Sequence, residues 1–163
     1  MSAGRVVPLE RPELTVEALE ARVGQDIGVS GWRTIAQADI DAFADVTDDD
    51  QFIHVDEGRA RAETAFGGTI AHGFLTLSLL SAFGREALPP LAGRRMGVNY
   101  GFDRVRFLSP VRSGSRVRGR FTLAGLERRG AGELMLRYRV SVELEGGPKP
   151  ALVADWLTLA ILG

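Results

Sequence analysis

Two residues in a polar stretch near the middle of the chain have the types and the spacing for acid–base catalysis. Asp49 and His54 lie five positions apart in the segment Thr47 to Asp56. A carboxylate and an imidazole this close can hold one water molecule between them and transfer its protons. Either residue alone would more often be a turn residue or a packed histidine. Because they occur together, we predict that Asp49 and His54 form a catalytic pair.

A glycine pair and a long apolar segment follow these two residues. Gly67 and Gly68 precede residues 69–87, which are apolar on almost every helical face and are followed by Pro89. Such a pattern predicts one long, buried helix that ends before the proline. Near Gly73, where this helix opens, unpaired backbone N–H groups could stabilise a developing negative charge on oxygen. The alternative interpretation of Gly73 is a glycine required only for packing.

Two further polar residues are weaker candidates for the site. Ser81 lies about two helical turns beyond Gly73, and Asn99 lies early in a predicted strand. Either side chain could contact a substrate, although a hydrogen bond to the nearby backbone is the simpler explanation of both. His72 is the other histidine of the chain, and we predict a structural role for it.

The segment Thr47 to Asp56 resembles the hydratase signature of the MaoC-like (R)-specific enoyl-CoA hydratases, in which a Gly-Asp pair leads to a histidine. The segment Ile70 to Leu75 is similar to the second marker of that family. The order of the two segments and the spacing between them also agree with the family pattern. The resemblance implies a hot-dog fold, catalytic roles for Asp49 and His54, and a Gly73 amide directed at the thioester oxygen. Asp48 replaces the family's usual glycine, which indicates a backbone with positive φ that Asp tolerates better than most residues.

The function implied by the resemblance is reversible addition of water to a trans-2-enoyl thioester of CoA or acyl carrier protein, giving the (3R)-3-hydroxyacyl product. No metal or redox cofactor is expected, because the thioester itself polarises the alkene and acidifies Cα. Two alternatives stay open. One is a hot-dog acyl-CoA thioesterase, and the other is a non-catalytic acyl-binding or partner subunit.

The rest of the chain predicts an α+β domain over residues 1–163, with an irregular tail at residues 1–12. Thr34 and Gln37 have capping-box spacing and predict the start of a helix that leads to Asp49. Alternating patterns bounded by turn residues predict strands at 96–108, 115–126, 133–144 and 151–162. One antiparallel sheet wrapped around one helix leaves a strand edge free, which favours a homodimer.

Composition narrows the function classes further. The 163 residues carry a net charge of −1, which gives no indication of nucleic acid or an anionic membrane as a partner. The absence of cysteine excludes a Cys nucleophile and Cys-ligated metal. Without a signal-like apolar segment at the N-terminus, we expect a cytoplasmic protein. The cations are almost all arginine, a residue type suited to CoA phosphates. The candidates are Arg94, Arg95, Arg104 and Arg106, whereas Arg116, Arg118 and Arg120 alternate as on a solvated strand face.

Overall fold

The sheet is built mainly from the C-terminal part of the chain. The computed structural model describes residues 11–163, in which β1, β4, β5, β6 and β3 follow one another across an antiparallel sheet and β2 also pairs with β4. The four predicted long strands are confirmed, with ends shifted by at most three residues. The strands are β1 Asp26–Val29, β2 Arg33–Thr34, β3 Arg94–Phe107, β4 Arg116–Arg129, β5 Glu133–Leu144 and β6 Leu152–Leu162.

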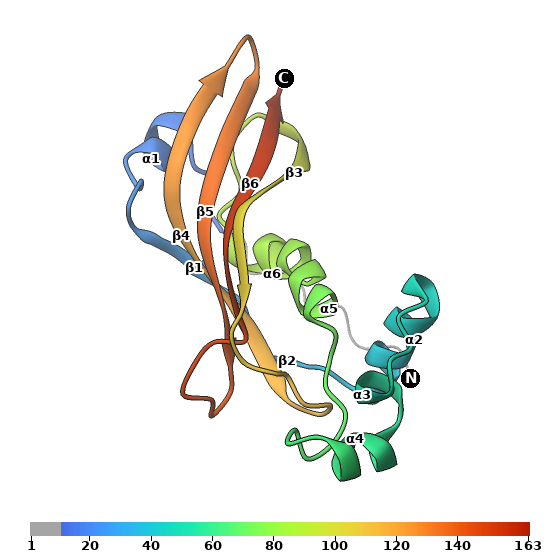
Figure 1. The fold of residues 1–163 in the computed structure, drawn as a ribbon. Coiled ribbons are helices and arrows are strands. Elements are labelled where there is room, and N and C mark those ends of the chain that lie inside the picture. The colour runs from blue at the N-terminus through green and yellow to red at the C-terminus, as the bar shows by residue number, and fades with distance from the viewer. Residues whose placement is uncertain (1–10) are drawn as a thin grey trace.

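The sheet curves around the helices α5 (Gly73–Ser78) and α6 (Leu80–Ala87), which lie against its concave face (Figure 1). Alternate residues of β4 point inward, so that Val117, Phe121 and Leu123 are completely buried. Phe83 of α6 belongs to the same core. A Cβ atom at Gly119 would lie 2.9 Å from the Cβ of Phe83, so this glycine allows helix and sheet to approach closely.

The central helix differs from its prediction in extent and in burial. It begins at Gly73 instead of Thr69, because residues 69–71 are extended and the Ala71 N–H donates to the Val111 carbonyl at 2.7 Å. Leu79 interrupts it for one residue between α5 and α6. The apolar face is also less complete than expected, since Phe74 is 65% exposed. The helix is nevertheless the element that the sheet wraps.

Three short helices lie to one side of the lower part of the sheet in Figure 1, and the segment with Asp49 and His54 runs through them: α2 Gln37–Thr47, α3 Phe52–Val55 and α4 Glu57–Glu63. The predicted capping box at Thr34 is wrong, because Thr34 pairs with Arg116 in the sheet. The helix begins two residues later, and the Asp39 carboxylate accepts a hydrogen bond from the Ala36 N–H at 3.1 Å. The prediction for Asp48 is confirmed, since it ends α2 in the left-handed region with φ 55°.

The N-terminal part of the described chain is small. Helix α1 spans Val16–Glu20. Thr15 is its N-cap, and the Thr15 hydroxyl accepts a hydrogen bond from the Ala18 N–H. The predicted irregular tail, residues 1–12, falls almost entirely outside the described residues. Within residues 11–163, every helix is too short or too polar to cross a membrane.

Candidate active site

His54 is fixed in place by the extended segment that leads into the central helix. The Ile70 N–H donates to the Ile53 carbonyl at 3.0 Å, and the His54 Nδ1 lies 2.7 Å from the Ile70 carbonyl oxygen. A carbonyl oxygen only accepts hydrogen bonds, so Nδ1 carries the proton and neutral His54 has its free lone pair on Nε2. His54 is thereby oriented as a proton acceptor at a buried position, 8% exposed.

The environment of His54 favours this neutral form. Burial lowers the pKa of the His54 imidazole, and the nearby His72 ring lowers that pKa further, while the hydrogen bond to Ile70 and the charge of Asp49 oppose the change. The net direction is downward from 6.5. At neutral pH, Nε2 of His54 is therefore available to accept a proton.

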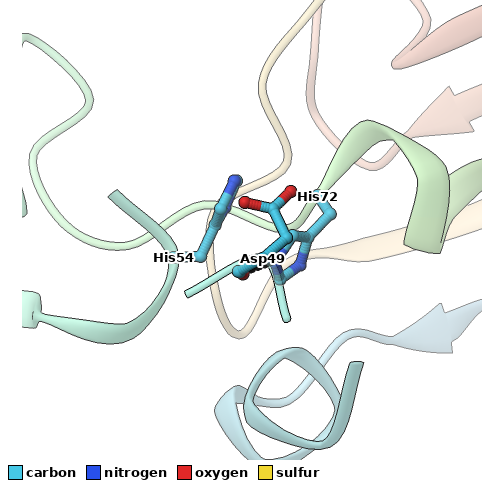
Figure 2. A group of neighbouring side chains, drawn as sticks. All are labelled: Asp49, His54 and His72. Carbon is cyan, nitrogen blue, oxygen red and sulfur yellow. Dashed lines mark hydrogen bonds between the residues drawn. The ribbon is translucent and has the colours of Figure 1, made fainter. Parts of the chain in front are cut away.

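Asp49 reaches the same point from the turn that follows α2. The positive φ of Asp48 reverses the chain there and places the exposed Asp49 side chain next to the His54 ring (Figure 2). One ligand atom from each of Asp49, His54 and His72 lies within 4.8 Å of the others. The structure thus brings together the two residues that we predicted as a catalytic pair.

His72 belongs to this cluster, which its sequence position alone did not reveal. Its ring stacks on that of His54 with centroids 3.8 Å apart. Its Nε2 lies 2.8 Å from the backbone carbonyl oxygen of Asp49, so this nitrogen donates and holds the turn in place. Its buried Nδ1 has no hydrogen-bond partner within the described part of the chain. His72 is thus in direct contact with both members of the pair.

The same three residue types could in principle ligate a metal ion, but the ring geometry does not favour it. The His54 and His72 planes are inclined by only 25° at a centroid distance of 3.8 Å. Imidazole lone pairs lie in the ring planes, and a zinc ion sits about 2.0–2.1 Å from each ligating nitrogen. Two nearly parallel, stacked planes do not converge at such a distance. The two rings would have to change their stacking to share one ion.

Gly73 follows directly after this histidine and is the first residue of α5. Its N–H has no partner within the helix, as is general for the first turn. A Cβ atom at this position would lie 2.9 Å from the Phe107 ring, so packing alone already requires a glycine. The preceding residue, His72, contacts the pair, and the oxyanion role of the Gly73 amide stays a prediction.

Ser81 and Asn99 contact each other, at a different place from the Asp49 and His54 pair. The Asn99 side-chain amide donates to the Ser81 hydroxyl at 3.2 Å. Both line a cavity of about 920 Å³ between α6 and strands β3, β5 and β6, and neither Asp49 nor His54 lines it. The two weaker candidates therefore lie farther along the central helix, on the wall of a space large enough for a ligand.

The arginine candidates separate into distinct groups. Arg94 lines the cavity, whereas Arg104 lies in a groove formed by strand residues such as Arg139 and Asp155. The expected solvated face of β4 is present. Its arginines form ion pairs with two glutamates: Arg116 with Glu145, and Arg118 and Arg120 with Glu143.

Comparison with known proteins places this geometry in a family. The sequence pattern of the family described as MaoC like domain matches residues 18–143, most of the chain. The chain belongs to the MaoC-like family. The resemblance inferred from Asp49, His54 and the Ile70 to Leu75 marker is therefore confirmed, together with the hot-dog fold, which solved MaoC-like structures share.

The relatives of this MaoC-like chain carry different names. Nodulation protein N of Rhizobium leguminosarum bv. viciae is 54% identical over 147 residues, covering 90% of this chain and 91% of its own. 3-Hydroxyacyl-thioester dehydratase Z of Mycobacterium tuberculosis is 45% identical over 141 residues, covering 86% and 92%. The R-hydratase PhaJ1 of Pseudomonas aeruginosa superposes with a TM-score of 0.65 at 27% identity, covering 86% of this chain and 83% of that one.

Proposed function

We propose that this MaoC-like protein adds water reversibly to trans-2-enoyl thioesters, as an (R)-specific enoyl-CoA hydratase or 3-hydroxyacyl-thioester dehydratase. The observation that carries the proposal is the Asp49–His54 pair, with Nδ1 of His54 donating to the Ile70 carbonyl and Nε2 left as an acceptor. The names of relatives, a 3-hydroxyacyl-thioester dehydratase and an (R)-specific enoyl-CoA hydratase, support it.

In this proposal, one water molecule donates two hydrogen bonds, one to the Asp49 carboxylate and one to Nε2 of His54. Its oxygen forms the new C–O bond at Cβ as the π bond of the alkene opens, and Asp49 takes the proton that the water loses. The electron pair moves through Cα to the thioester oxygen, which the Gly73 amide stabilises. Cα then takes the proton back from Asp49, so the atoms of water and alkene balance without a cofactor.

The experiment that tests this function follows two signals in one reaction. Purified protein is added to crotonyl-CoA and to a medium-chain trans-2-enoyl-CoA, and both the enoyl absorbance and the release of free thiol are recorded. The hydratase proposal predicts loss of the enoyl absorbance without free thiol. Thiol release would instead identify a thioesterase, and tight binding with neither signal would identify a non-catalytic acyl-binding subunit.

The lowered pKa of His54 predicts the acid side of the pH profile. Protonation of His54 removes the lone pair on Nε2, so activity is lost as pH falls through the His54 pKa. Because burial lowers that pKa, the acid limb of kcat/KM is expected to have its midpoint below pH 6.5, the ordinary histidine value. The measurement is kcat/KM for crotonyl-CoA from pH 4.5 to pH 8. An acid limb centred above pH 6.5 would contradict this environment for His54.

We also propose that two copies of the chain associate through β3. This strand is at the end of the strand order, and apolar side chains along it are exposed: Met96 at 54%, Val98 at 41%, Tyr100 at 55% and Phe102 at 38%. An exposed apolar edge strand is a template for pairing with another strand. A second copy of this MaoC-like chain offers the same edge and would cover both.

The dimer proposal predicts the mass of the native protein in solution and a variant in which the dimer dissociates. Size-exclusion chromatography with light scattering is expected to give about twice the chain mass of 17.6 kDa for the native protein. The variant Met96→Asp places a charge in the apolar edge and is expected to shift the population to monomer. Glu127→Asp, an exposed change on β4, serves as the matched control. A monomeric native protein at micromolar concentration would refute the proposed association.

A further inference from the structure

The cavity beside α6 has a distinctive arrangement of polar and apolar groups along its length. Ser81 on α6 and Asn99 on β3 line this cavity and form a hydrogen bond with each other. The apolar side chains of Leu88, Leu136 and Trp156 also line it. A hydrocarbon fits against such groups, whereas the amides of a pantetheine arm would lose hydrogen bonds there. This apolar part of the wall suits an acyl chain.

Three arginines from separate segments of the chain line this cavity. Arg11 precedes α1, Arg85 lies on α6 and Arg94 begins β3. The Arg11 side chain donates to the Arg85 backbone carbonyl at 3.4 Å. None of the three lies within ion-pair distance of a carboxylate among residues 11–163. Glu13 is the one carboxylate that lines the cavity, which leaves an excess of positive charge.

The backbone holds this cationic group in position. The Leu14 N–H donates to the Pro90 carbonyl at 2.9 Å, and the Ala92 N–H donates to the Leu14 carbonyl at 2.9 Å. The segment that carries Arg11 is thus tied to the turn that leads into Arg94. Tyr138 adds a neutral hydroxyl on the cavity wall, because burial raises the pKa of this phenol to about 12, although the charge of Arg94 opposes the rise.

We propose that Arg11, Arg85 and Arg94 bind a carboxylate at the far end of the acyl chain, so that the preferred substrates are thioesters of long-chain dicarboxylic acids. This inference rests on the proposed thioester site at Asp49, His54 and Gly73. At 1.5 Å per residue, Arg85 lies about 18 Å along the helix from Gly73, roughly the length of fifteen extended single bonds. An extended chain of about sixteen carbons has this length.

The test measures binding separately from turnover, using Trp156 on the cavity wall as a fluorescent reporter in a Trp32→Phe background. The ligands are the saturated mono-CoA ester of hexadecanedioic acid and hexadecanoyl-CoA, both below their micelle concentrations. The diacid ester is expected to bind about tenfold more tightly, since charge-assisted hydrogen bonds to guanidinium groups are strong. Arg85→Gln and Arg94→Gln are each expected to reduce this preference several-fold, whereas Arg22→Gln, an exposed arginine outside the cavity, retains it.

Two results would overturn the inference. One is equal or weaker binding of the diacid ester by the native protein. The other is an equal loss of affinity for both esters in Arg85→Gln and Arg94→Gln, which would assign these guanidinium groups to the CoA phosphates. Hydration of crotonyl-CoA by the same protein reports separately on the proposed function. Turnover without diacid preference refutes only the chain-end site, and diacid preference without turnover supports that site while refuting only the hydratase proposal.

Discussion

Replacing Asp49 with Asn is expected to lower kcat for hydration of crotonyl-CoA by about 10²- to 10⁴-fold, the usual contribution of a general acid–base group. The amide keeps the size of the carboxylate but cannot take a proton from water. The Asp49 side chain is exposed, and the hydrogen bond from His72 goes to its backbone carbonyl. The substitution therefore leaves the protein folded, and the loss appears in kcat with an unchanged thermal midpoint.

The adjacent acid supplies a matched control for this prediction. Asp50→Asn makes the same chemical change one residue later, at another exposed position of the same turn. It removes the same charge from the segment but no group from the Asp49, His54 and His72 cluster. If the two variants lose activity equally, the effect is one of local charge and Asp49 is not the base.

Replacing His54 with Asn is expected to have an effect on kcat of similar size, about 10²- to 10³-fold. The Asn amide nitrogen can still donate to the Ile70 carbonyl, as Nδ1 does at 2.7 Å in the native protein. It has no group in the place of Nε2, so the second acceptor for the water is lost. Steady-state hydration of crotonyl-CoA measures the loss.

His54→Ala separates this catalytic effect from a structural one. Alanine also leaves the buried Ile70 carbonyl without its side-chain donor, which typically costs about 1–3 kcal/mol of unfolding free energy. We expect His54→Ala and His54→Asn to share the loss of kcat and only His54→Ala to unfold at a clearly lower temperature. Near-normal turnover in His54→Asn would show that Nε2 takes no part in the reaction.

Local signals in the sequence were sufficient to predict that Asp49 and His54 lie close together, and to predict most of the sheet. Asp48 was predicted to adopt a positive φ because it replaces a glycine, and its φ is 55°. The four long strands were predictable because alternating apolar residues and glycine-containing turns bound them. Asp49 and His54 were predictable because their relation is set by one turn and one short helix.

Features that depend on distant parts of the chain were missed. Thr34 has the spacing of a helix cap, but pairing with Arg116 places it in a strand, so tertiary contacts override the local preference. The contact of His72 with His54 is set by the extended residues 69–71, which no periodicity indicated. The cationic end of the cavity combines Arg11, Arg85 and Arg94 from three segments. Sequence spacing carries no information about such convergence.

The most direct test of the central claim follows the oxygen atom of water. Native protein is incubated with crotonyl-CoA in water enriched in ¹⁸O, and the products are analysed by mass spectrometry with the free acid and the thioester separated. A hydratase that uses Asp49 and His54 is expected to place one ¹⁸O at C3 of an intact 3-hydroxybutyryl-CoA, and Asp49→Asn to place almost none in the same time. Label in the carboxylate of released crotonic acid, with none at C3, would contradict the assignment and identify a thioesterase.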